Sequence, residues 1–160
     1  MVYRFIYGMT GGPAQDVEDL TAETFLRAWK GRRGFIGNEK AAIGWIFKIA
    51  RNIVVDVYRR RNVQGTETHL DEIDLISPGD SPEEHLLLRE QLGVIFGFLD
   101  DLPVATREMY VLRYFFDWSI KEIADHLDML ENTVSVTLRR ATIRIKEQWS
   151  DKYEERTHDT

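Results

Sequence analysis

The chain has 160 residues, of which 43 % are hydrophobic and 30 % charged, and it contains no cysteine. This length fits one medium domain or two small ones, and the composition is that of a folded, soluble protein. The lack of cysteine excludes disulfides, thiolate metal sites and cysteine nucleophiles. No apolar run approaches the ~18 residues of a membrane span, and no signal-peptide pattern opens the chain, so we expect a cytoplasmic protein without membrane insertion.

The net charge of −6 conceals a segregated charge pattern. Residues 27–61 hold ten Lys or Arg residues and two acidic residues, whereas residues 62–101 hold one Arg and ten acidic residues. Residues 139–146 hold four Lys or Arg residues and no acidic residue. Because phosphate binding depends on local patches and not on the total charge, the two basic segments favour nucleic-acid binding.

Glycines and capping residues divide the first part of the chain into three predicted helices. The first covers residues 2–10 before Gly11, and the second covers residues 14–30 and closes at Gly31. A glycine-rich loop follows, and in it Asn38 is a suitable N-cap for a third helix over residues 40–61. The residues of that helix that share one arc, and that we predict to be buried, are Ala42, Ile46, Ile49, Ala50, Ile53 and Val57.

The second part of the chain begins with a predicted linker. Residues 62–80 lack periodicity and are rich in turn-forming and acidic residues. Ser81 and Glu84 then have the spacing of a capping box, which predicts a helix to about residue 99. Further helices are predicted over residues 102–116, 119–127 and 131–149, before a polar tail at residues 151–160. The predicted fold class is all-α, with two small helical domains (residues 1–61 and 81–150) joined by an acidic linker.

The last two predicted helices have the spacing of a helix-turn-helix. Ser119 with Glu122 starts the shorter helix, and Asp128 lies in the turn, where it can adopt a left-handed conformation. In the longer helix we expect Val134, Leu138, Ala141, Ile145 and Trp149 to pack inward. Asn132, Ser135, Val136, Arg139, Arg140 and Ile143 point outward. In a DNA-bound helix-turn-helix, such residues near the start of the second helix reach the major groove, and arginines further along reach phosphates. An ordinary helical hairpin with a solvated basic face fits the same pattern.

Trp45 lies at the edge of the polar face of the predicted helix over residues 40–61. Lys48, Arg51, Asn52 and Arg59 share that face. Binding of single-stranded DNA needs an aromatic ring on which a base can stack and cations that contact the phosphate backbone of the DNA, and this face offers both. The same residues also fit a purely structural role, in which Trp45 is partly buried and the basic end of the helix complements the helix dipole.

Two stretches of the chain carry a family resemblance. Residues 16–29 (DVEDLTAETFLRAW), followed by IARN at residues 49–52, resemble the first domain of the extracytoplasmic-function (ECF) RNA polymerase sigma factors of the sigma-70 family. Residues 102–147 resemble the second domain, through VLRYF at residues 111–115 and LRRA at residues 138–141. The stretches occur in the family's order and with its spacing.

The resemblance implies a function and a set of partners. A sigma factor of this kind binds core RNA polymerase, at the β′ clamp helices and the β flap, and directs transcription initiation at specific promoters. It has no catalytic activity, cofactor or metal, and an anti-sigma factor is an expected partner. The implied polymerase-binding residues are Asp19, Glu23, Phe25 and Arg27. The implied promoter-binding residues are Trp45, Lys48, Arg51, Asn52 and Arg59 for the −10 element, and Asn132, Ser135, Val136, Arg139 and Arg140 for the −35 element.

Three other functions account for less of the sequence. A helix-turn-helix regulator that acts without docking on polymerase explains residues 119–149 but gives no purpose to the helix at residues 16–29. An adaptor that kept the fold and lost DNA binding is a further alternative. An enzyme is disfavoured, because the sequence has no phosphate loop and no nucleophile elbow. Its histidines, which form no metal-ligand pair, are His69, His85, His126 and His158.

Overall fold

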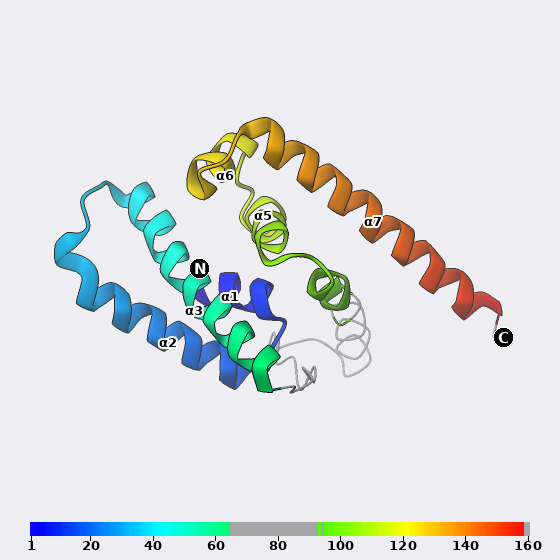
Figure 1. Cartoon of the computed structure of the whole chain (residues 1–160), viewed down its shortest axis with the longest axis horizontal. Helices are drawn as coiled ribbons and strands as arrows, with labels where there is room; N and C mark the ends of the chain where they lie inside the picture. The colour runs from blue at the N-terminus through cyan, green and yellow to red at the C-terminus, as the bar shows by residue number, and fades with distance from the viewer. Residues whose placement is uncertain (65–92, 94, 159–160) are drawn as a thin grey trace, which may run out of the picture. The chain divides into compact units, whose positions relative to one another are not determined.

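The structure is a computed structural model that describes residues 1–64, 93 and 95–158 (Figure 1). The described residues form helices and connecting loops without a strand, which confirms the all-α class. The chain divides into two compact units, Met1–Phe96 and Gly97–Thr160. Most of the predicted linker, and the helix start predicted at Ser81, lie outside the described residues, so the predicted domain boundaries stay predictions. None of the described helices has the length and apolar composition that crossing a membrane requires.

The first unit is built from three helices that pack against one another. They are α1 (Val2–Thr10), α2 (Ala14–Gly31) and α3 (Glu39–Gln64), with a short 3-10 helix η1 (Arg32–Gly34) after α2. Each of the three α-helices contacts the other two. The core is made by one face of each helix, namely Phe5, Ile6 and Met9 of α1, Val17, Thr24 and Ala28 of α2, and Phe47, Ala50, Ile53 and Val54 of α3.

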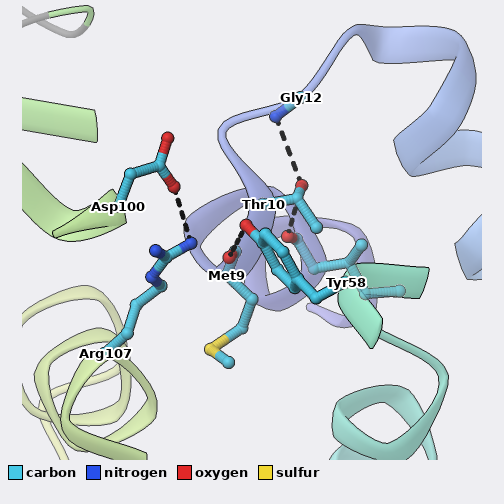
Figure 2. Close-up of polar contacts among 7 residues, drawn as sticks. Met9, Thr10, Gly12, Tyr58, Asp100 and Arg107 are labelled. Atoms are coloured by element: carbon cyan, nitrogen blue, oxygen red, sulfur yellow. Dashed lines mark hydrogen bonds and ion pairs between the residues drawn. The ribbon is translucent and has the colours of Figure 1, made fainter. Parts of the chain in front are cut away.

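The end of α1 is fixed by a left-handed glycine and by side-chain hydrogen bonds. Gly11 has φ 56°, and its N–H donates to the carbonyl of Tyr7 at 2.8 Å. A Cβ at Gly11 would lie 3.0 Å from the ring of Phe96, so both the backbone conformation and the space require glycine. The hydroxyl of Tyr58 on α3 donates to the carbonyl of Met9 at 3.1 Å (Figure 2). The last turn of α1 is therefore tied to α3.

The buried face of α3 differs from the predicted arc. Ala50 and Ile53 are buried as predicted, but Phe47 and Val54 are buried too. The other predicted core residues, Ala42, Ile46, Ile49 and Val57, are only half-buried. The physical reason is Phe47, whose ring stacks on that of Phe5 with centroids 4.4 Å apart and planes inclined by 9°. The largest buried side chain of α3 is thus Phe47, and the buried face is turned toward it and away from Ile46 and Ile49.

The second unit contains α5 (Val104–Phe115), α6 (Ile120–Leu127) and α7 (Glu131–His158). These three helices contact one another in every pair. Before α5, residues 95–100 are also helical. The guanidinium of Arg107, which is buried, lies 2.7 Å from the carboxylate of Asp100 and links α5 to this preceding segment (Figure 2).

The end of α7 corrects two predictions. The helix continues to His158, whereas we predicted an end at about residue 149 and a polar tail. Residues 150–158 contain neither Gly nor Pro and include Lys, Glu and Arg, so helix propensity persists after the apolar periodicity has ended. Ile145 is half-buried and Trp149 is 36 % exposed, so these two predicted core residues lie at the margin of the buried face. The ring of Trp149 contacts that of Phe98, with centroids 6.2 Å apart.

Candidate nucleic-acid interface

The loop between α2 and α3 presents an apolar residue to solvent. Ile36 is 95 % exposed, and it follows η1 and Phe35. The side-chain oxygen of Asn38 accepts a hydrogen bond from the N–H of Ala41 at 2.9 Å, so the predicted N-cap is confirmed and α3 begins directly after it. The loop therefore ends at Asn38, seven residues before Trp45.

Trp45 is held by the loop and by the end of α2. Its ring packs on that of Phe35 with centroids 5.0 Å apart and planes inclined by 32°. A Cβ at Gly31 would lie 3.4 Å from the indole of Trp45, which shows how close α2 approaches. The side chain remains half-buried. Trp45 is thus a positioned aromatic residue at the surface, and not a core residue.

A polar face continues from Trp45 along α3. Lys48, Asn52 and Arg59 are exposed, and their spacing from Trp45 places them on the same side of the helix. Phe47, Ala50 and Val54 line the opposite, buried side. Arg51 is half-buried and lies on the flank. The structure therefore brings together four of the five residues predicted for the −10 element, with Arg51 beside them.

The exposed side of α2 is more apolar than the sequence analysis predicted. Phe25 is 52 % exposed, and beside it Leu26 and Trp29 are 47 % and 65 % exposed. The ring of Trp29 lies under the guanidinium of Arg32 at 3.8 Å, an arrangement that shields one face of the indole. Sequence reasoning missed Leu26 and Trp29 as surface residues, although helical spacing places both away from the buried Val17 and Ala28.

The charged residues predicted for polymerase binding lie on a neighbouring strip of α2. Asp19 is exposed. The guanidinium of Arg27 donates to the carboxylate of Glu23 at 2.7 Å, and both side chains are partly exposed. An exposed i,i+4 pair of this kind contributes little to stability, about 0.3–0.5 kcal/mol. Because this pair adds so little to stability, these exposed charges can exchange it for contacts with a partner.

The helix-turn-helix has the predicted start and turn. The hydroxyl oxygen of Ser119 accepts from the N–H of Glu122 at 3.2 Å, and the N–H of Ser119 donates to the carboxylate of Glu122 at 2.8 Å. These bonds complete the predicted capping box. Asp128 closes α6 with φ 55° and ψ 50°, the left-handed conformation that we expected of it. The chain then enters α7 within three residues.

The exposed face of α7 carries every residue predicted for the −35 element. Val134, Leu138 and Ala141 are buried, and they define the inner face. The exposed residues on the outer part of the helix are Asn132, Ser135, Val136, Arg139 and Arg140. The first turns of α7 thus present exposed side chains at the positions that reach base edges in a DNA-bound helix-turn-helix, and two arginines follow them.

A buried polar pair supports the helix-turn-helix from within. The Nε2 of His126 on α6 lies 3.2 Å from Oε1 of Glu108 on α5, and both side chains are buried. Trp118 places its edge on the imidazole, with centroids 5.3 Å apart and planes at 88°. Sequence analysis recorded His126 only as a scattered histidine, because a partner 18 residues away leaves no local signal.

Two family models match the chain along the two units. Sigma-70 region 2 matches residues 1–63, and Sigma-70 region 4 matches residues 96–145. The chain belongs to the sigma-70 family. Its relatives place it in the ECF group, as the resemblance implied, and it is an RNA polymerase sigma factor. Sigma factors are transcription initiation factors and not catalysts, and the alternative of a regulator that acts without polymerase is not favoured.

The similar proteins are ECF and related sigma factors of several bacteria. The ECF RNA polymerase sigma factor SigW of Bacillus subtilis is 27 % identical over 94 % of this chain and 83 % of its own length. The RNA polymerase sigma factor NccH of Alcaligenes xylosoxydans xylosoxydans is 30 % identical over 84 % of this chain and 74 % of its own length. SigL of Mycobacterium tuberculosis is 29 % identical over 88 % of this chain and 78 % of its own length.

Two solved structures have a similar fold. The sigma factor RpoE of Bartonella quintana, in complex with the anti-sigma factor NepR, has a TM-score of 0.69 at 21 % identity, over 93 % of this chain and 89 % of that one. CnrH, in complex with the cytosolic domain of CnrY, has a TM-score of 0.66 at 21 % identity, over 94 % of this chain and 81 % of that one. At this identity the likeness concerns the fold.

Proposed function

We propose that this cytoplasmic sigma factor divides its work among three exposed surfaces. The outer side of α2 binds core RNA polymerase at the β′ clamp helices. The face of α3 that carries Trp45 opens and captures the promoter −10 element, and the exposed face of α7 binds the −35 element. The observation that carries this proposal is that each surface lies opposite a buried helix face, within the segments that the two family models match.

The polymerase-binding role of α2 rests on its exposed apolar side chains. Phe25, Leu26 and Trp29 are large, and a single helix presents all three to solvent. Aromatic residues in a water-excluded contact contribute much of the binding energy of protein interfaces. Asp19, Glu23 and Arg27 flank this patch, where charges set the orientation and the association rate of a partner. We assign the β′ clamp helices to this patch, and the β flap to the second unit.

The −10 role of α3 rests on the aromatic pair at its start. Trp45 is positioned by Phe35, and Lys48 and Asn52 are exposed beside it. A base that leaves the duplex can stack on an aromatic side chain, while cations neutralise the phosphates of the single strand. Arg51 and Arg59 extend the cationic surface along the same helix.

An anti-sigma factor is the further partner that we propose. Both similar structures are complexes, one of the sigma factor RpoE with the anti-sigma factor NepR and one of CnrH with the cytosolic domain of CnrY. A protein that covers the exposed apolar residues of this chain would block polymerase and would be favoured by the same burial of apolar area. We assign no catalysis, cofactor or metal to the chain.

Site-specific photocrosslinking tests the three assignments separately. A photoreactive phenylalanine analogue replaces Phe25, Asn52 or Ser135 in the full chain, which is then bound to core polymerase and a promoter. We expect crosslinks to β′ from position 25, to −10 DNA from position 52 and to −35 DNA from position 135. The matched control is Arg4, which is exposed on α1, a helix that carries none of the assigned residues. Crosslinks from position 52 to β′ alone, or from position 135 to protein alone, would contradict the DNA assignments.

A further inference from the structure

The start of α7 has an unusual composition for a helix that recognises DNA bases. Its first eight residues, 131–138, are ENTVSVTL and include no Lys or Arg. The first arginine, Arg139, comes after two full turns. In a DNA-bound helix-turn-helix, the residues near the start of the recognition helix reach the base edges. The base-contacting part of α7 is therefore uncharged or acidic, and its cations lie further along the helix.

This composition restricts which bases α7 can recognise. Guanine presents two acceptors, N7 and O6, in the major groove, and Arg or Lys is the side chain that pairs with both. A carboxamide pairs with N6 and N7 of adenine, and an apolar side chain packs on the 5-methyl group of thymine. The first two turns of α7 offer a carboxamide, an apolar side chain and hydroxyls on the surface, but no Lys or Arg to pair with both acceptors of guanine.

Asn132 and Val136 are the two residues placed to make these contacts. Both are exposed, with Val136 at 37 %, and both lie opposite the buried Val134, Leu138 and Ala141. Residues four apart on a helix are neighbours, with Cβ atoms about 5–6 Å apart. Since base pairs follow each other every ~3.4 Å, the two side chains face pairs one or two steps apart.

We propose that α7 recognises the −35 element at two nearby A·T pairs, through adenine at Asn132 and the thymine methyl at Val136. This inference rests on the proposed −35 role of α7 and names the base chemistry of that site. Ser135 can bond to more than one base and adds little discrimination. Arg139 and Arg140 contact phosphates, which fixes the register of the helix without selecting a sequence.

The first experiment is a selection from promoters with a randomised −35 region, using the full chain assembled with core polymerase. We expect the selected promoters to have A·T pairs at two positions that lie one or two steps apart. Any guanine that is enriched should be enriched equally with the Asn132→Ala and Val136→Ala proteins. Enrichment of guanine that Asn132→Ala or Val136→Ala abolishes would overturn the proposal. A selection without any −35 preference would instead remove the −35 role of α7, and the inference would fall with it.

Base analogues then test each contact on the selected promoter. Uracil in place of thymine removes only the 5-methyl group, and we expect binding to fall roughly threefold to fivefold. In the Val136→Ala protein, thymine and uracil promoters should bind alike. For Asn132, 7-deazaadenine carries a C–H group in place of N7. We expect binding of the unchanged protein to this promoter to fall about fivefold or more, and binding of the Asn132→Ala protein to stay the same. Equal binding of thymine and uracil promoters by the unchanged protein would refute the methyl contact.

Ile143→Ala provides the matched control for Val136→Ala. Ile143 is 46 % exposed on the same side of α7, two turns further along, about 10 Å from Val136 by helix rise. It lies beyond the turns that reach base edges, so its truncation should leave the difference between thymine and uracil unchanged. A loss of that difference in Ile143→Ala would show that the effect is not a local methyl contact.

Discussion

Phe35 and Trp45 pack ring against ring with centroids 5.0 Å apart, and so join the loop after α2 to the first turns of α3. Because each ring supports the other, truncating Trp45 releases the loop as well as removing a surface for base stacking. Asn52 lies two turns further along the same face, is exposed, and is a cleaner probe of DNA binding.

Asn52→Ala should impair promoter opening while leaving polymerase binding intact. If Asn52 contacts a base or the backbone of the single strand, its loss should reduce open-complex formation by about 1–2 kcal/mol, the scale of a hydrogen bond lost at an interface. The measurement is the permanganate reactivity of unpaired thymines, with Arg4→Ala on the exposed side of α1 as the control. An equal fall in polymerase affinity would point to a folding defect and contradict the assignment.

Phe25→Ala should weaken polymerase binding without unfolding the chain. Phe25 is 52 % exposed, so its truncation opens no core cavity and should change stability by about 0.5 kcal/mol or less. A central aromatic contact contributes about 2 kcal/mol or more to an interface, which is at least a thirtyfold loss in affinity. Affinity for core polymerase and chemical denaturation are measured together. Val17→Ala, in the buried face of α2, is the contrast that should lose stability first. Unchanged affinity of Phe25→Ala would exclude this residue from the interface.

Replacing both Arg139 and Arg140 with Ala should make −35 binding less sensitive to salt. Each phosphate contact contributes about 0.9 to the slope of log affinity against log salt, so the slope should fall by about 1.8. The measurement is a titration of holoenzyme binding to promoter DNA at several salt concentrations. Val136→Ala is the control, because Val136 is exposed on the same face of α7 but carries no charge, so the slope should stay as it is. A slope that does not change would mean that these arginines do not touch phosphate.

Tyr7→Phe should stabilise the first unit and reduce its sensitivity to alkali. The Tyr7 hydroxyl is buried without a hydrogen-bond partner among the described residues, and its removal should gain about 1 kcal/mol. Burial, with a smaller effect of Tyr3, raises the pKa of Tyr7 to about 12. Between pH ~10 and that value the unfolded chain loses this proton and the folded chain keeps it, so stability falls as pH rises.

Denaturation at pH 7 and pH 11 measures both effects of the Tyr7 substitution. Tyr58→Phe is the matched contrast at pH 7, since the Tyr58 hydroxyl donates to the carbonyl of Met9 and its loss should destabilise the first unit by about 1 kcal/mol. If Tyr7→Phe were destabilising at pH 7, the hydroxyl would have a partner after all.

The sequence predicted most helix ends because their capping chemistry is local. Gly11, Asn38 and the Ser119–Glu122 box each act within a few residues, and the structure places each where its pattern indicated. Local signals also placed the outer face of α7, since Val134 and Leu138 mark the buried side unambiguously. The family followed from motif order, and both family models confirm it.

The features that the sequence did not show on α2, α3, α5 and α6 depend on contacts between distant parts of the chain. The arc predicted for α3 did not include Phe47, whose burial follows from its stack on Phe5. The pairing of Glu108 with His126 joins two helices and has no sequence pattern of its own. Phe25 was ambiguous between core and surface, because the sequence does not show which side of α2 the other helices cover.

Adding the purified chain to core RNA polymerase is the most direct test of its assignment as a sigma factor. We predict that the chain co-elutes with core and permits transcription from defined start sites on promoter DNA that core alone does not use. A folded chain that fails to bind core, or that binds duplex operator DNA tightly without polymerase, would contradict it.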